Sequence, residues 1–393
     1  MRMCTARTLL LLATLAAPAA ASAQGSVKVT VPLDQLQAAA RRDSNDPAAH
    51  YNLALGYMSK KRWGPADSAL RTALQIDRRF AAAHLAFAYL PYLQRPKLWE
   101  EISEGKVTPE WQQRLAEARS SERASYLIDP LVDRRILGAA RYRVGWLFNA
   151  GVFGEFFNLY FQGLADLEDG KFQEAYDRFN RLASMGLTWS DGEPLWVYWY
   201  RGNAAAQLGN WPVATGDLQR LLDASVAEEK TDTTVNVPLL TNDYRYILAI
   251  FRQKAGNLQG AEQLFKEALD QDVGMYMANV HLAEIYEAGS LWDLAIRERE
   301  RAVQANPDDP SLLIEWGITL GKSGHFADAE QRLQEAIQLQ PRDTRAYYWL
   351  GIAQQQLGKG AEAKATFERF VTLAPSRYER QITAARQRIA QLQ

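Results

Sequence analysis

One pattern of small, large and polar positions recurs along most of the chain. In the C-terminal half, a small residue stands every 34 positions, at Ala261, Ala295, Ala329 and Ala363. Each follows another small residue by 12 positions, and the same step joins Ala54 to Ala66, Gly163 to Ala175 and Gly202 to Ala214. Small residues at helical spacing let two helices approach closely, so the pattern predicts a series of paired helices.

Two further columns describe each expected pair. Five residues before the second small residue lies a column that suits a tight turn, because glycine ends a helix without steric cost: Lys61, Gly170, Gly209, Gly256, Ser290, Gly324 and Gly358. Four residues after the second small residue lies a column of mostly large residues: Leu70, Phe179, Leu218, Phe265, Arg299, Leu333 and Phe367. One pair cannot bury its apolar face alone, so we expect the pairs to stack.

Two stretches carry a resemblance to a known family. "AEQRLQEAIQLQP" (residues 329–341) and "YWLGIAQQQLGKGAEAKATFERFVTLAP" (residues 348–375) resemble tetratricopeptide repeats, and the matching columns extend this over most of residues 47–377. The resemblance implies an all-α, right-handed α-solenoid of stacked helix-turn-helix units. We expect these units at 47–80, 81–132, 156–189, 195–228, 242–275, 276–309, 310–343 and 344–377.

The N-terminus is typical of an export signal. Arg2 and Arg7 precede an apolar run and the small triplet at 21–23, which predicts a secretory signal peptide over residues 1–23. An uncleaved anchor is the alternative, but the run is short and contains Pro18. No Asn-x-Ser/Thr triplet occurs, which favours a bacterial periplasmic or secreted protein over a eukaryotic one.

The other segments fall between the repeats. We expect an N-terminal lead-in at 24–46, repeats 1 and 2 at 47–132 with an insert in the second, an extra helical segment at 133–155, repeats 3 and 4 at 156–228, a loop at 229–241, repeats 5 to 8 at 242–377, and a C-terminal capping helix at 378–393. Segment 133–155 is apolar enough for a transmembrane helix to be considered. Its arginines and glycines favour a buried additional helix instead, so we expect no transmembrane helix after signal cleavage.

Composition and motifs argue against catalysis. The formal net charge is −1, which disfavours nucleic acid and anionic lipid as partners. The one cysteine, Cys4, lies inside the expected signal, so the mature chain has no disulfide or cysteine metal site. The four histidines lack metal-ligand spacing and no nucleophile elbow occurs. We therefore expect a non-enzymatic protein without metal or cofactor.

The first helix of each unit is expected to line a concave surface, where ligands of the resembled family bind. Positions on that side are rich in aromatic side chains, which dominate binding hot spots. The candidate contacts are Tyr51, Phe157, Tyr160, Trp196, Trp199, Asn203, Tyr246, Glu284 and Tyr348. The alternative is that tight curvature buries many of them.

Two functions remain open at this stage. The first is an exported scaffold that binds a peptide or partner protein in its aromatic groove, within a bacterial envelope assembly. The second is a cell-wall glycan-binding protein that uses the same groove. Some members of the family bind a C-terminal carboxylate through lysine, arginine and asparagine, but this sequence lacks that set.

Overall fold

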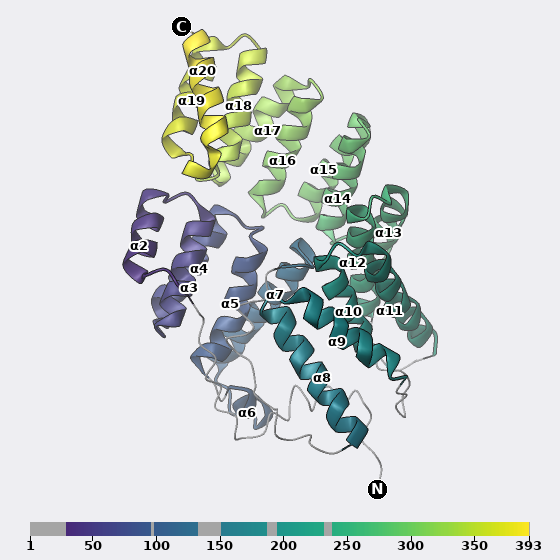
Figure 1. The fold of residues 1–393 in the computed structure, drawn as a ribbon. Helices are drawn as coiled ribbons and strands as arrows, with labels where there is room; N and C mark the ends of the chain where they lie inside the picture. The colour runs from purple at the N-terminus through teal and green to yellow at the C-terminus, as the bar shows by residue number, and fades with distance from the viewer. Residues whose placement is uncertain (1–28, 96–97, 133–150, 187–194, 232–237, 393) are drawn as a thin grey trace. The chain divides into compact units, whose positions relative to one another are not determined.

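The structure is a computed structural model that describes residues 29–95, 98–132, 151–186, 195–231 and 238–392. The expected signal peptide, residues 133–150 of the expected extra segment and residues 232–237 of the expected loop lie outside these ranges. The described residues form an all-α fold of successive helix pairs (Figure 1). No described helix is both long and apolar enough to cross a membrane.

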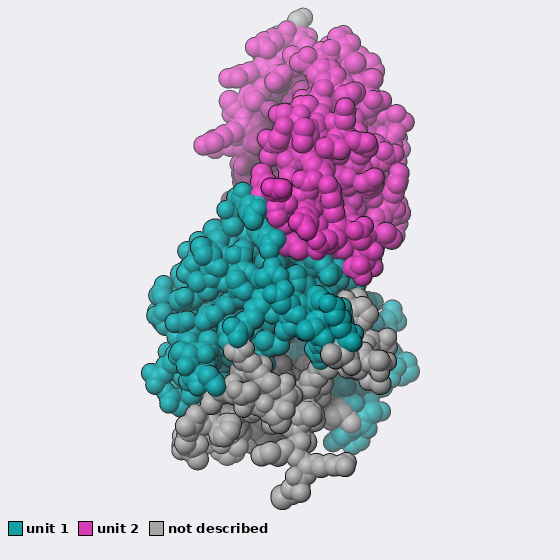
Figure 2. All heavy atoms as spheres, turned by 90° about the vertical axis from the view of Figure 1, so that its right-hand side faces the viewer, with its two compact units in different colours: residues 1–29, 58–63, 81–257 teal, residues 30–57, 64–80, 258–393 magenta. Residues whose placement is uncertain are grey.

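The chain divides into two compact units, coloured teal and magenta in Figure 2. Unit 1 comprises residues 1–29, 58–63 and 81–257, and unit 2 comprises residues 30–57, 64–80 and 258–393. Unit 2 thus combines most of the first repeat with the C-terminal repeats. Each unit is described separately below.

Unit 1 contains eight of the described helices: α5 (Ala81–Gln94), α6 (Leu98–Ser103), α7 (Pro109–Ile128), α8 (Gly151–Glu168), α9 (Phe172–Ser184), α10 (Trp196–Gln207), α11 (Trp211–Thr231) and α12 (Pro238–Lys254). Helix α7 packs on α5, as expected for the second helix of the interrupted repeat, and the short α6 lies in the insert between them. Helix α8 begins at Gly151, so residues 151–155 of the expected extra segment belong to it.

Unit 2 contains three early helices, two of them in large part, and the C-terminal series. Its elements are α2 (Leu33–Arg42), α3 (Pro47–Ser59) and α4 (Trp63–Ile76), then α13 (Leu258–Gln271), α14 (Tyr276–Ala288), α15 (Trp292–Ala305), α16 (Pro310–Lys322), α17 (Phe326–Leu339), α18 (Thr344–Gln356), α19 (Gly360–Leu373), the 3-10 turn η2 (Ser376–Tyr378) and α20 (Glu379–Gln391). Consecutive helices from α13 to α20 pack on each other in chain order.

The column of second small residues and the turn column are both confirmed. The second small residues Ala66, Ala175, Ala214, Ala261, Ala295, Ala329 and Ala363 are fully buried. All seven residues of the turn column have positive φ, from 54° at Lys61 to 88° at Gly324. The turn geometry is therefore the same in each pair, and Lys61 and Ser290 adopt a left-handed conformation that glycine adopts more readily.

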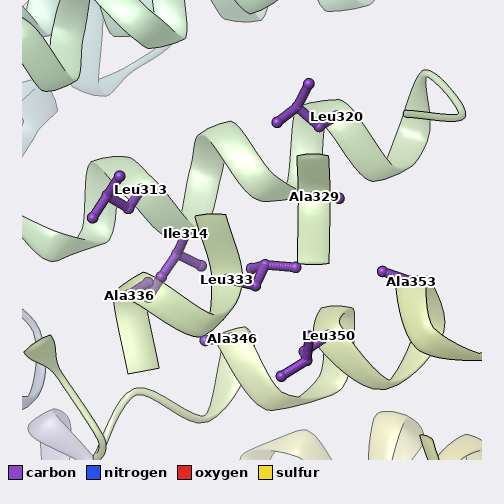
Figure 3. Packing of buried hydrophobic residues seen from close by; sticks show 9 residues of the cluster. All are labelled: Leu313, Ile314, Leu320, Ala329, Leu333, Ala336, Ala346, Leu350 and Ala353. Carbon is purple, nitrogen blue, oxygen red and sulfur yellow. The ribbon is translucent and has the colours of Figure 1, made fainter. Parts of the chain in front are cut away.

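The core of the C-terminal repeats shows how the columns interlock. Leu333 and Ala329 of α17 lie between Ile314 of α16 and Leu350 of α18 (Figure 3). Helix α20 follows this series, with Ala385 fully buried and Ile382 and Ile389 packed on the same cluster as Phe367.

Two of the segments expected outside the repeats contain helical residues. The lead-in contains helix α2, whose Leu36 and Ala40 are buried and whose Asp34, Arg41 and Arg42 complement the helix dipole. The loop expected at 229–241 overlaps two helices, because α11 continues to Thr231 and α12 begins at Pro238. Residues 224–231 contain no glycine or proline and are rich in good helix formers, and proline is favoured at a first helical position.

The first-helix glycines make a testable contribution to packing. A Cβ added at Gly351 would lie 2.7 Å from the Phe367 ring, whereas one added at the exposed helical Gly216 meets nothing within 4 Å. We expect Gly351→Ala to destabilise, since overpacking costs about 1–3 kcal/mol, and Gly216→Ala to stabilise by up to about 1 kcal/mol through helix propensity. Urea unfolding of both variants measures this difference, and equal shifts in the same direction would contradict it.

Candidate partner-binding surface

Unit 1 gathers aromatic side chains on the first helices of three successive repeats. We call Tyr160 of α8, Trp196, Trp199 and Tyr200 of α10, and Tyr244 of α12 the aromatic stripe. All five side chains are half-buried. The register of the repeat explains the arrangement, because Tyr160 and Trp199 each lie three residues before the small residue of their helix.

Ring contacts link the stripe from helix to helix. The Trp196 ring lies 4.4 Å from that of Tyr160 and 5.5 Å from that of Phe156, both edge-on. Tyr160 lies 5.8 Å from Tyr200, and Tyr200 stacks on the buried Phe179 at 5.4 Å. Such pairs add to area burial, so one side of the stripe is anchored in the core of repeat 3.

The second part of the stripe joins α10 to α12. The Trp199 and Tyr244 rings meet edge-on at 6.0 Å. Burial is the main cause that raises the pKa of Tyr244, and the nearby Tyr200, Asp243 and Glu228 raise it further. Burial and a hydrogen bond with Tyr200 likewise raise the pKa of Tyr160. Both phenols stay neutral at physiological pH and keep a polar group at the edge of an apolar surface.

A partly buried ion pair joins α10 to α11. Arg201 stands where the resembled family prefers an aliphatic residue, and its guanidinium forms two hydrogen bonds to Asp217 of α11, at 2.9 and 2.6 Å. The hydrogen bond to Asp217 raises the pKa of Arg201. Arg201 and Arg220 both lie over the buried Tyr198 ring. Charge pairing and cation–π contact therefore accommodate an arginine at this position.

The structure separates the predicted contact residues of unit 1 into two groups. Tyr160, Trp196 and Trp199 belong to the stripe. Asn203 and Tyr246 are instead buried: the Asn203 amide donates to the Trp199 carbonyl at 2.8 Å, and the Tyr246 hydroxyl donates to the Leu127 carbonyl at 2.6 Å. Phe157 lies in α8, with a side chain outside the described part of the structure.

The other three predicted contacts belong to unit 2. The Tyr51 ring meets Phe80 at 5.3 Å. Glu284 is exposed, and its carboxylate lies 3.0 Å from the His281 ring nitrogen Nδ1. Tyr348 is half-buried against Phe367 and Phe370. Each stays a predicted contact of its own repeat.

Sequence reasoning did not name Tyr244 as a contact. It lies two positions before Tyr246, and the column that selected candidates picked Tyr246 instead. The high aromatic content of "NDYRYILAIF" was the signal available. Across the described residues, the structure brings together no group of three histidine, cysteine, aspartate or glutamate side chains that could hold a metal ion.

Comparison with known proteins identifies the repeat. The tetratricopeptide repeat family model matches residues 248–310 and 314–378. The chain therefore contains tetratricopeptide repeats in these two ranges.

Two curated relatives are similar to parts of the chain. The type IV pilus assembly protein PilF of Pseudomonas aeruginosa is 30% identical over 120 residues, which cover 30% of this chain and 48% of that protein. The protein O-mannosyl-transferase TMTC1 of Homo sapiens is 27% identical over 137 residues, which cover 34% of this chain and 16% of that protein. The chain thus spans less than half of the length of either relative.

Solved structures show distant similarity. The C-terminal part of a TPR repeat-containing protein from Cytophaga hutchinsonii superposes with a TM-score of 0.46 at 16% identity, covering 60% of this chain and 95% of that chain. MamA from Desulfovibrio magneticus gives a TM-score of 0.39 at 19% identity, covering 46% of this chain and 96% of that chain.

Proposed function

We propose that this protein is a non-enzymatic scaffold that binds a peptide segment or a partner protein through the aromatic stripe. The observation that carries the proposal is the run of half-buried tyrosine and tryptophan side chains over α8, α10 and α12. Aromatic rings held by packing on one side offer contact area at low entropic cost, and their hydroxyl and indole groups offer hydrogen bonds.

The proposed setting is a bacterial envelope assembly. The predicted export signal at residues 1–23 supports an extracytoplasmic location, and the similarity to a protein named for type IV pilus assembly supports a role among envelope components. The partner is then another exported protein. A cell-wall glycan is the alternative ligand, because aromatic faces also stack on sugar rings.

Two tryptophans of the same repeat provide a matched test. Trp199 on the first helix meets Tyr244 at 6.0 Å and 63°, and Trp211 on the second helix meets Phe251 at 6.1 Å and 67°. Both are half-buried. Each replacement by alanine removes the same side chain and one comparable ring contact, but only Trp199 belongs to the stripe.

We expect Trp199→Ala to weaken partner binding by about 30-fold or more, as for a hot-spot aromatic residue, and Trp211→Ala to leave it nearly unchanged. A photo-reactive amino acid at position 199 identifies the partner in envelope extract, and calorimetric titration of the purified partner with each variant measures affinity. Equal losses in both variants would refute the stripe as the binding surface. Saturable quenching of tryptophan fluorescence by purified cell-wall fragments, lost in Trp199→Ala, would replace the protein partner with glycan.

A further inference from the structure

Within unit 2, polar atoms of the first repeat contact the C-terminal repeats. The Gln340 amide, at the end of α17, donates to the carbonyls of Gln75 at 3.0 Å and Ile76 at 2.6 Å. These carbonyls belong to the last turn of α4, where backbone oxygens have no partner within the helix. Gln340 is buried, so the end of α4 is capped by a residue more than 260 positions away in sequence.

A second set of contacts lies at the loop that precedes α3. Arg342 donates to the Asn45 side-chain oxygen at 3.0 Å, and the Asn45 amide donates to the Leu373 carbonyl at 3.1 Å. Arg377 pairs with Asp46 at 2.6 Å. The contacts at both ends of the first repeat are thus hydrogen bonds and ion pairs.

A third contact is made by the partly buried Arg79, just after α4. One guanidinium nitrogen donates to Glu315 Oε2 at 3.0 Å, and the other terminal nitrogen donates to Glu315 Oε1. The Arg79 Nε atom lies 3.9 Å from Asp309 Oδ2. This paired geometry is the fork-to-carboxylate arrangement that arginine forms and lysine does not. The Arg79 side chain is 11% exposed.

Charge balance favours this position of the guanidinium. Burial alone would lower the pKa of Arg79, but Glu315 and Asp309 raise it above its ordinary value. Burial alone would raise the pKa of Glu315, but Arg79 and Arg299 hold it below its ordinary value. Both groups are charged at neutral pH. Glu315 also pairs with Arg299 at 2.7 Å, so Arg79 shares this carboxylate with a second guanidinium. Removal of Arg79 therefore breaks the paired hydrogen bonds that hold the first repeat.

We propose that Glu315 of α16 and Asp309, the residue before α16, form an arginine-binding site that Arg79 of the same chain fills. The first repeat is then a clasp on the C-terminal repeats that can be released when Arg79 leaves this site. When the first repeat is released, its hydrogen bonds and ion pairs with the C-terminal repeats are replaced by hydrogen bonds with water. A partner that brings an arginine to this part of α16 must displace Arg79.

Chemical rescue of Arg79→Ala tests the clasp in the full chain. Alanine keeps Cβ, so ethylguanidinium matches the group that is removed, and ethylammonium is the control cation. The readout is amide hydrogen exchange in residues 64–80 compared with α17. The control variant is Arg71→Ala, because Arg71 is exposed on α4, the helix that precedes Arg79, and pairs with Asp67 one turn earlier.

We expect exchange in residues 64–80 of Arg79→Ala to become about 30-fold faster or more, as for loss of one partner of a buried pair, while α17 stays protected. Millimolar ethylguanidinium restores protection, ethylammonium does not, and Arg71→Ala behaves as wild type. Unchanged exchange in Arg79→Ala overturns the clasp. Parallel loss of protection in α17 overturns it too, because Arg79 would then support the whole fold. Equal rescue by both cations overturns the arginine specificity.

Discussion

Replacing Arg299 with alanine is expected to lower the free energy of unfolding of unit 2 by about 3–5 kcal/mol, the cost of removing one partner from a buried ion pair. Arg299 occupies the column that holds leucine or phenylalanine in the six other repeats compared, and it is only 6% exposed. Its guanidinium pairs with Glu287 at 2.8 Å and with Glu315 at 2.7 Å. Alanine would leave both carboxylates without the cation that they share.

Without Arg299, each carboxylate keeps one other cation, Arg79 at Glu315 and Lys322 at Glu287, but neither of these cations pairs with both carboxylates. Lys322 pairs with Glu287 at 3.0 Å from a side chain that is 42% exposed, and Thr319 donates to the same carboxylate at 2.6 Å. Burial would raise the pKa of Glu287, but Arg299 and these two donors hold it below its ordinary value. The carboxylate therefore stays ionised, and alanine at position 299 would also leave a void beside it.

Arg297→Ala is the matched control. Arg297 lies on the same helix but is exposed, and its guanidinium donates to the Asp293 carbonyl of the preceding turn. Surface replacements of this kind change stability by about 0.5 kcal/mol or less. Urea unfolding followed by circular dichroism measures both variants. Similar small shifts in the two would show that the Arg299 network contributes little to unit 2.

Two arginines occupy positions of the repeat where apolar residues are expected, and ion pairs accommodate them there. Arg201 and Arg299 both stand where apolar residues are expected, and each pairs with a carboxylate 16 residues later in sequence, Asp217 and Glu315. Arg201 reaches the second helix of its own repeat, whereas Arg299 reaches the first helix of the next. Opposite charges at this separation were visible in the sequence, and the repeat register would have allowed both pairs to be predicted.

The repeat was predictable because its determinants are local. The 12-residue step and the turn column act within one helix pair, so spacing alone located the buried alanines and the positive-φ turns. Contacts between distant repeats were not predictable in this way. The hydrogen bond from the Gln340 amide to the Ile76 carbonyl joins residues 264 positions apart, and the repeat period does not predict such a contact.

The same limit explains the mixed outcome for the aromatic column. Trp199 and Tyr246 occupy equivalent positions, three residues before a small residue, and from sequence both were expected on the binding face. Trp199 is half-buried beside Tyr244, whereas Tyr246 is fully buried and bonds to Leu127 of α7. Helix α7 comes from the repeat that carries an insert, so its position depends on residues outside the periodic pattern.

Tyr246 is therefore expected to affect stability and not binding. Removing a buried aromatic side chain typically costs about 3–5 kcal/mol, so Tyr246→Ala should destabilise unit 1 by about this amount. Tyr246→Phe keeps the ring but leaves the Leu127 carbonyl, in the last turn of α7, without its hydroxyl donor, which should cost about 1–3 kcal/mol. Urea unfolding monitored by circular dichroism measures both changes.

The comparison with Trp199→Ala separates a core residue from a proposed contact residue. Tyr246→Phe should bind the partner with wild-type affinity while it unfolds at lower urea concentration, because its hydroxyl is already bonded inside the protein. Trp199→Ala should show the opposite behaviour, since its ring is half-buried and loses a single ring contact. If Tyr246→Phe weakened binding at full folding, the Tyr246 hydroxyl would have to leave Leu127 when the partner binds, and the binding face would extend along α12.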